Sequence, residues 1–69
     1  MRDWRRIFGS NVREVRVERG LTQERVAFDA EIDLTYLGGI ERGKRNPSLL
    51  VMGRIARALK VELVDLLAP

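Results

Sequence analysis

The side chains in this sequence that are best suited to chemistry are cations, and three of them stand close together at Arg42, Lys44 and Arg45. Guanidinium and ammonium groups bind anionic oxygens, and one arginine can donate two parallel hydrogen bonds to a phosphate. A second cationic group, near the N-terminus, consists of Arg2, Arg5 and Arg6. Two cationic segments separated by an acidic stretch could straddle a polyanion. On charge alone, ordinary solvated helix faces explain the pattern equally well.

The composition excludes most other chemistry. The 69 residues include no cysteine and no histidine, which removes disulfides, thiolate nucleophiles, soft-metal ligands and the commonest general base. We therefore expect no enzyme activity, no catalytic residues, no metal and no cofactor. Because 45% of the residues are apolar and 33% are charged, residues 1–69 should fold as one domain around one small core. The sequence has neither a membrane-length apolar run nor a signal peptide, so we expect a cytoplasmic protein that does not bind a membrane.

Apolar residues recur three and four positions apart throughout the chain, and they never alternate over the length of a strand. This periodicity predicts an all-α fold. Gly20 and Gly43 suit the left-handed positions that end helices, and Thr22 and Asp33 are good N-terminal caps. From these signals we expect five helices, at about 4–19, 23–30, 34–42, 48–59 and 63–67.

The helix expected at 34–42 has two very different sides when it is projected at 100° per residue. Its inner side consists of Leu37, Ile40 and Glu41, and its outer side of Thr35, Gly38, Gly39 and Arg42. Glycine inside a helix costs roughly 0.5–1 kcal/mol relative to alanine, so an adjacent pair is unexpected on a face that merely meets water. Close approach of another surface, such as DNA, explains the pair, and drift on a tolerant surface is the alternative. We expect this outer side to be open to solvent and flanked by guanidinium groups.

Several spaced motifs resemble those of one known family. They are Gly20-Leu21-Thr22-Gln23-Glu24, Val26-Ala27, Tyr36-Leu37, the run from Ile40 to Ser48, and Ile55-Ala56-Arg57-Ala58-Leu59, with Arg16 preceding Gly20. The pattern covers nearly the whole chain and resembles the lambda-repressor-like, or XRE, helix-turn-helix proteins. This resemblance implies a five-helix fold whose third helix lies in the major groove of double-stranded DNA. Within the family, residues 35–43 look closest to the controller proteins of restriction-modification systems.

The resemblance also implies roles for individual residues in DNA binding. Base contacts fall to Leu34, Thr35, Gly38 and Gly39, and backbone contacts to Thr22, Gln23, Tyr36, Arg42, Lys44 and Arg45. Thr22 is better explained as a helix cap, and the Tyr36 ring could instead pack at the edge of the core. Controller-like relatives often have arginine at the position of Leu34, and leucine cannot hydrogen-bond to guanine. We therefore expect little direct base readout and a large share of recognition through DNA shape.

Other positions are predicted to serve structure. The resemblance implies a buried ion pair between Arg16 and Glu41 that links the third helix to the scaffold. Glu31 and Lys60 stand where the family commonly has glycine, and Glu62 where a serine or aspartate would cap the last helix. A residue other than glycine at positive φ loses roughly a kcal/mol, so we expect local strain or adjusted geometry at these sites.

Aliphatic residues off the core stripes of the last two helices predict a homodimer. The expected interface consists of Leu50, Val51, Arg54, Val64 and Leu67. Trp4 and Ile7 could join this patch, although we favour a place for them over the core. A two-fold dimer would suit a pseudopalindromic operator, and we expect a regulator of transcription. Two alternatives stay open: an antitoxin or docking module that holds a partner protein, and the DNA-binding domain of a longer regulator.

Overall fold

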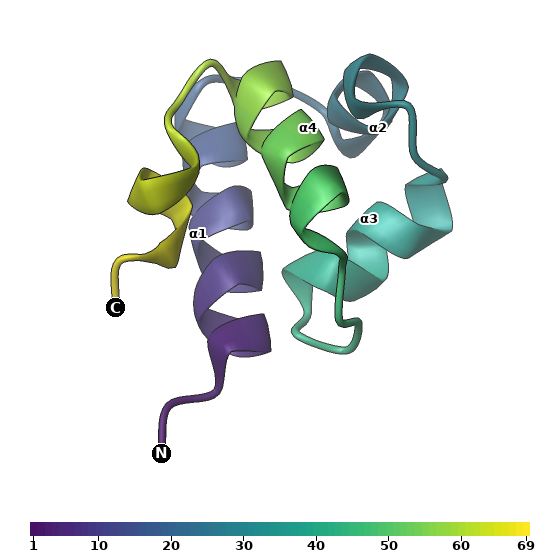
Figure 1. Cartoon of the computed structure of the whole chain (residues 1–69). Helices are drawn as coiled ribbons and strands as arrows, with labels where there is room; N and C mark the ends of the chain where they lie inside the picture. Colours follow the sequence, from purple (N-terminus) through teal and green to yellow (C-terminus); the bar gives the residue numbers. More distant parts are fainter.

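The computed structural model describes residues 1–69, which form four α-helices and one short 3₁₀-helix (Figure 1). The α-helices are α1 (Trp4–Glu18), α2 (Gln23–Ala30), α3 (Leu34–Glu41) and α4 (Leu49–Leu59), and the 3₁₀-helix is η1 (Leu63–Leu67). The all-α fold is confirmed, but the expectation of a fifth α-helix is wrong. Over so few residues the tighter i→i+3 pattern satisfies the backbone, and the Asp65 amide donates to the Glu62 carbonyl oxygen at 3.0 Å.

Each α-helix begins at a residue whose side chain accepts a hydrogen bond from the first turn. Asp3, Thr22, Asp33 and Ser48 accept from the backbone amides of Arg5, Arg25, Thr35 and Val51 at 3.0–3.2 Å. These bonds satisfy amides that have no partner inside the helix. The sequence therefore fixes where every helix starts.

The left-handed positions fall where the sequence predicted them. Gly20 and Gly43 have φ of 68° and 73°, whereas Glu31 (φ 58°) and Lys60 (φ 60°) hold the same conformation with a side chain. At Glu31, hydrogen bonds from α4 offset part of the cost of the left-handed conformation. The Arg54 guanidinium on α4 donates to the carbonyl oxygens of Ala30 at 2.9 Å and Glu31 at 3.5 Å. Arg54, which the sequence predicted at a dimer interface, thus also caps the C-terminus of α2.

One hydrophobic core lies between the helices and reaches from α1 to η1. It consists of Phe8, Val12, Val26, Ala27, Ala30, Leu37, Ile40, Ile55, Ala56, Leu59 and Leu66. In Figure 1, α1 and α4 separate η1 from α2 and α3, and η1 packs on both α1 and α4. The C-terminal segment is held there because the Asn11 amide donates to the carbonyl oxygens of Leu66 and Ala68 at 3.0 and 2.8 Å.

The crossing of α1 and α3 depends on a glycine. Gly9 on α1 is buried, and a Cβ at this position would press into the backbone carbonyl of Ile40 on α3. A backbone cannot yield as a flexible side chain can, so only glycine fits. The crossing sets the C-terminal half of α3 directly against α1.

Burial corrects one sequence expectation about an apolar residue. Trp4, expected over the core, is 52% exposed, since it is the first residue of α1 and a helix end follows the ideal stripe poorly. Val51 and Leu67, which the sequence predicts at a dimer interface, are half-buried and pack against the core, so each leaves part of its side chain accessible. None of the helices is long and apolar enough to cross a membrane.

Candidate nucleic-acid interface

A buried carboxylate, that of Glu41, ties three helices together behind the outer surface of α3. Arg16 on α1 binds it through two hydrogen bonds, Nε to Oε2 at 2.7 Å and Nη2 to Oε1 at 3.0 Å. The Gln23 side-chain amide at the start of α2 donates to Oε1 at 3.0 Å. The Glu41 side chain is 2% exposed and that of Arg16 is 13% exposed. The ion pair implied by the family resemblance is therefore present, and it fixes α1, α2 and α3 relative to one another.

The electrostatics of this pair keep Arg16 charged. Hydrogen bonding to Glu41 raises the pKa of Arg16 above its ordinary value, against an opposing effect of burial. A cation with a raised pKa in the folded state adds stability at every pH below its unfolded pKa. Because that value lies far above neutrality, the arginine side of the pair is insensitive to physiological pH. The remaining Arg16 nitrogen, Nη1, donates to the Leu21 carbonyl oxygen at 2.9 Å, so the whole guanidinium is satisfied.

The outer side of α3 differs from the sequence expectation. Gly38 and Gly39 are buried, so the prediction that this side is bare and open to solvent is wrong. Arginine side chains cover both glycines: Arg42 Nη1 lies 3.3 Å from the position of a Cβ on Gly38, and Arg45 Cγ lies 2.9 Å from one on Gly39. Arg45 comes from beyond the helix, so a projection of α3 alone gives no sign of it. The two arginine side chains therefore cover the glycines in addition to flanking them.

Tyr36 packs at the edge of the core, one of the two interpretations that the sequence left open, and its proposed DNA contact stays a prediction. Its half-buried ring packs against the core, and Arg45 Cζ lies 5.6 Å from the ring centroid. That distance allows a cation–π interaction. Beside it, Leu34 is 41% exposed and Thr35 is exposed, at the N-terminal end of α3. The accessible surface of α3 therefore consists of Leu34 and Thr35 at its N-terminal end, and Arg42 and Arg45 extend it beyond the C-terminal end.

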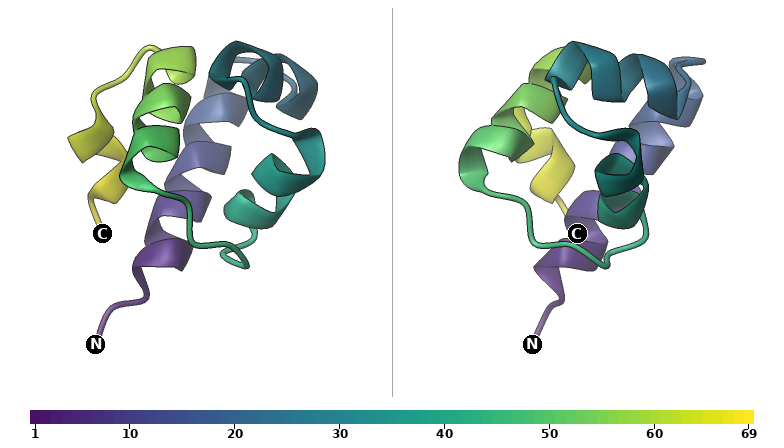
Figure 2. Two further views of the ribbon diagram at one scale, coloured as in Figure 1. Left: turned by 45° about the vertical axis from the view of Figure 1, so that its right-hand side comes forward. Right: turned by 90° about the vertical axis from the view of Figure 1, so that its right-hand side faces the viewer.

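The two cationic segments of the sequence meet in space. Gly43 packs on α1, where a Cβ would lie 2.8 Å from Arg6 Cγ and 3.2 Å from Arg6 Cα. The right-hand view of Figure 2 looks onto this side, with α2 above α3 and the loop to α4 running beneath. Lys44 in this loop is exposed, like Arg42 and Arg45. The two cationic segments are thus neighbours, since Arg6 contacts the loop that carries Lys44 and Arg45.

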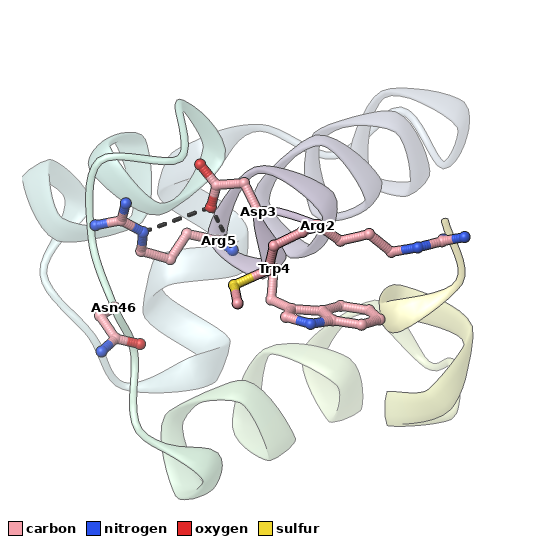
Figure 3. A pocket seen from close by; sticks show the side chains of 6 residues that line it. Arg2, Asp3, Trp4, Arg5 and Asn46 are labelled. Atoms are coloured by element: carbon pink, nitrogen blue, oxygen red, sulfur yellow. Dashed lines mark hydrogen bonds and ion pairs between the residues drawn. The ribbon is translucent and has the colours of Figure 1, made fainter.

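A shallow hollow lies beside these segments at the N-terminus. Figure 3 shows Arg5 and Asn46 on one side of it and Arg2 and Trp4 on the other. Asp3 partly neutralises Arg5, since Arg5 Nε lies 3.6 Å from Asp3 Oδ1. Sequence reasoning named Arg6 only as part of the N-terminal cationic group and did not single out Asn46, because the contact of Arg6 with Gly43 and the place of Asn46 beside Arg5 are tertiary. The requirement for glycine at position 43 was the only local signal of the Arg6 contact.

Exposed apolar side chains gather at two other places. On α4 and η1, Leu49, Leu50 and Val64 are 67–79% exposed, and Gly53 between them has open space around its Cβ position. On α2, Phe28 is 76% exposed. Neither Phe28 nor Leu49 was among the predicted site residues, and Leu49 falls at helical spacing with Met52 and Ala56, so the sequence predicts a place for it on the core stripe.

Comparison with known proteins now places this geometry in a family. The sequence model of the helix-turn-helix family matches residues 12–66. The chain belongs to that family, in its XRE branch. An uncharacterised HTH-type transcriptional regulator, y4dJ, of Sinorhizobium fredii is 42% identical over 97% of this chain and 87% of the relative. The control protein C.BamHI of Bacillus amyloliquefaciens is also 42% identical, over 91% of this chain and 79% of that protein.

A solved structure supports the same placement. The restriction-modification controller protein C.AhdI from Aeromonas hydrophila superposes with a TM-score of 0.87, at 44% sequence identity, over 90% of this chain and 94% of that one. Both the family resemblance and the likeness to controller proteins that the sequence indicated are confirmed. The two-helix unit made by α2 and α3 is therefore the helix-turn-helix of this chain.

Proposed function

We propose that this protein is a DNA-binding regulator of transcription that acts as a homodimer and places α3 in the major groove of a pseudopalindromic operator. The observation that carries the proposal is the pair of guanidinium groups, from Arg42 and Arg45, held over the outer side of α3. A helix enters the major groove of B-DNA when its outer side is free and its flanks attract phosphates. The regulators and controller proteins among its relatives fit the same role.

Phosphate binding follows from the cationic residues at and after the end of α3. Lys44 and the two arginines that flank it, Arg42 and Arg45, form no ion pair with a carboxylate, so their charges are available to a ligand. Gln23 uses one amide proton for Glu41, which leaves its second proton for a phosphate at the positive end of α2. Thr22 caps this end and has its hydroxyl proton available. Each phosphate neutralised should steepen the dependence of log affinity on log salt by about 0.9.

Base recognition falls to the start of α3. Thr35 can hydrogen-bond to several bases, and the exposed Leu34 suits the methyl group of thymine. Gly38 and Gly39 offer no side chain, and the arginines above them stand between their backbone and a ligand. We therefore keep Leu34 and Thr35 as base contacts and propose Arg42 and Arg45 in place of the two glycines. With so few contacts, the deformability of the DNA should supply much of the sequence preference.

Dimerisation is proposed through the exposed aliphatic surface of α4 and η1. This surface consists of Leu49, Leu50 and Val64, and Gly53 would allow two copies of α4 to approach closely. Val51 and Leu67 support the surface from beneath, since they pack against the core. A two-fold axis here would set two α3 helices about 34–36 Å apart, one turn of DNA.

The test is an unbiased selection of binding sites from random duplexes, followed by affinity measurements over a range of salt. We expect a two-fold symmetric motif with few invariant guanines and a steep loss of affinity with salt. Absence of any duplex retention in dilute buffer would contradict the proposal. Sedimentation at the same concentrations gives the oligomeric state.

Phe28 favours a second candidate, a docking module for a partner protein. An exposed phenylalanine on α2 adds apolar surface that neither the core nor the proposed dimer contact covers. Such a role includes that of an antitoxin, and it is compatible with DNA binding through α3 and the loop that follows it. Steep salt dependence without a stoichiometric co-purifying protein would leave the regulator as the sufficient function.

A further inference from the structure

Resting on the proposed DNA binding, we propose that Gly38 and Gly39 are positioning residues that seat the side chains of Arg42 and Arg45 on α3. In this role the glycines do not touch DNA. They are small so that two arginine side chains can lie across the helix and present their guanidinium groups from fixed places. The glycine pair, which the sequence suggests is a bare surface, then provides the space in which the two arginine side chains pack against α3.

The seat of Arg45 is the better defined. Around the position of a Cβ on Gly39 lie three atoms of this one side chain, Cγ at 2.9 Å, Nε at 3.3 Å and Cδ at 3.6 Å. Any side chain at position 39 would displace the Arg45 stem, because real Cβ atoms do not approach other atoms so closely. One turn earlier, the Tyr36 ring receives the other end, with Arg45 Cζ 5.6 Å from its centroid. The stem thus rests on Gly39 and the charged head on an aromatic ring.

The seat of Arg42 is shallower and shared. Arg42 follows Gly38 by one helical turn, and its Nη1 lies 3.3 Å from the Cβ position of Gly38. The Gln23 amide nitrogen lies 4.0 Å from the same point. A methyl group there would press on the arginine and would only touch the glutamine. Gly38 therefore seats a cation next to the amide that Glu41 already holds.

The benefit of such seats is preorganisation. A long arginine side chain loses many rotamers when it is fixed in a complex, and part of that loss is avoided if the free protein already holds it near the bound geometry. Glycine is unfavourable within a helix, yet it occupies two of the eight positions of α3. Alanine at either position would favour the helix and unseat an arginine. Stability and DNA affinity should therefore respond to the substitution in opposite directions.

The experiment is a double-mutant cycle on the full chain, with a duplex selected by the wild-type protein as the probe. It compares wild type, Gly39→Ala, Arg45→Ala and the double variant. We expect Gly39→Ala to keep or raise the melting temperature and to weaken binding roughly 3- to 10-fold. In the Arg45→Ala background the same substitution should leave affinity unchanged. Ser10→Ala, at an exposed position of α1 outside the proposed interfaces, calibrates the gain in melting temperature expected of alanine in a helix.

A readout without DNA tests the seat itself. The Nε–Hε resonance of Arg45 should carry a ring-current shift from Tyr36 in the wild-type protein and lose it in Gly39→Ala. Unchanged affinity in Gly39→Ala would overturn the proposal. An equal loss in both backgrounds would also overturn it, because Gly39 would then be acting by its own close approach to DNA. Failure of the wild-type protein to bind any duplex would overturn the proposed function instead, and the resonance shift would still decide whether the seat exists.

Discussion

The two sides of α3, a helix of eight residues, differ in how their charged groups are partnered. On the inner side, Glu41 is buried and holds Arg16 and Gln23 through short hydrogen bonds, so both of its carboxylate oxygens are committed. On the outer side, Arg42 and Arg45 are exposed and rest on glycine without a carboxylate partner. The comparison suggests that one side of the helix maintains the fold, while the other holds charge ready for a ligand. Substitutions should therefore separate into those that unfold the protein and those that leave it folded with weaker binding.

The largest effect should come from Glu41→Ala on the inner side. It leaves the Arg16 guanidinium buried without its anion and frees the Gln23 amide, and breaking such a pair costs about 3–5 kcal/mol. Small domains have a free energy of unfolding of only about 5–15 kcal/mol, so this variant should be largely unfolded or close to it. Urea denaturation measures the loss. Glu14→Ala, which removes an exposed carboxylate from α1, is the control and should change little.

Gly9→Ala should have the next largest effect. Its methyl group would meet the Ile40 carbonyl, and backbone must move to make room. Overpacking of this kind costs about 1–3 kcal/mol. Ser10→Ala is the matched control, since it puts a methyl group at the next position of the same helix, which is exposed, and should stabilise the helix slightly. Equal stability of the two variants in thermal denaturation would mean that the α1–α3 crossing is not the constraint we describe.

Leu50→Glu tests a surface that belongs to neither side of α3. A carboxylate at this exposed position leaves the core untouched but puts like charges together across a two-fold axis. We expect the protein to sediment as a monomer at concentrations where the wild type is a dimer, and to bind a two-site operator at least about tenfold less tightly because the two halves no longer act together. Val17→Glu, on the exposed part of α1, is the control. A dimer that survives Leu50→Glu would place the interface elsewhere.

The outer side is tested by Arg42→Gln, which should lower affinity without lowering stability. Loss of one phosphate contact should reduce the slope of log affinity against log salt by about 0.9. Arg19→Gln removes the same charge at the C-terminal end of α1, far along that helix from Arg6 and the loop that packs on it. If both variants change the salt slope alike, DNA binding depends only on the net charge, and the loop residues make no specific phosphate contact.

Much of the fold could be predicted from local signals. Thr22, Asp33 and the glycines at 20 and 43 mark helix ends through hydrogen bonds and φ values that depend only on neighbouring residues. The inner side of α3 was also predictable, because burial follows the helical period. The fifth helix was the exception, since hydrophobic spacing does not distinguish one α-turn from a 3₁₀ segment of the same length.

The site was predictable only in part, because its decisive contacts join residues that no period relates. Arg45 reaches back over Gly39 from outside α3, and Arg54 caps a different helix from its own. Long flexible side chains find such partners only once the fold exists. The family resemblance supplied the ion pair of Arg16 and Glu41, which composition and periodicity alone would not have paired.

The smallest predicted effect is also the cleanest test of whether fold and binding can be changed separately. Lys60 holds a left-handed conformation, with φ of 60°, at the end of α4 and away from both sides of α3. Lys60→Gly removes the clash of the side chain with its own backbone but gives the unfolded chain more freedom, so the net gain should be about 0.5–1 kcal/mol. Chemical denaturation measures the gain, and DNA affinity and salt slope should stay as in the wild type. Glu31→Gly, with φ of 58°, should gain a similar amount, since the Arg54 bonds to this turn are made by carbonyl oxygens that glycine retains. A change in DNA affinity in either variant would mean that the strain at these turns reaches the binding surface, and that the two sides of α3 are less independent than their contacts indicate.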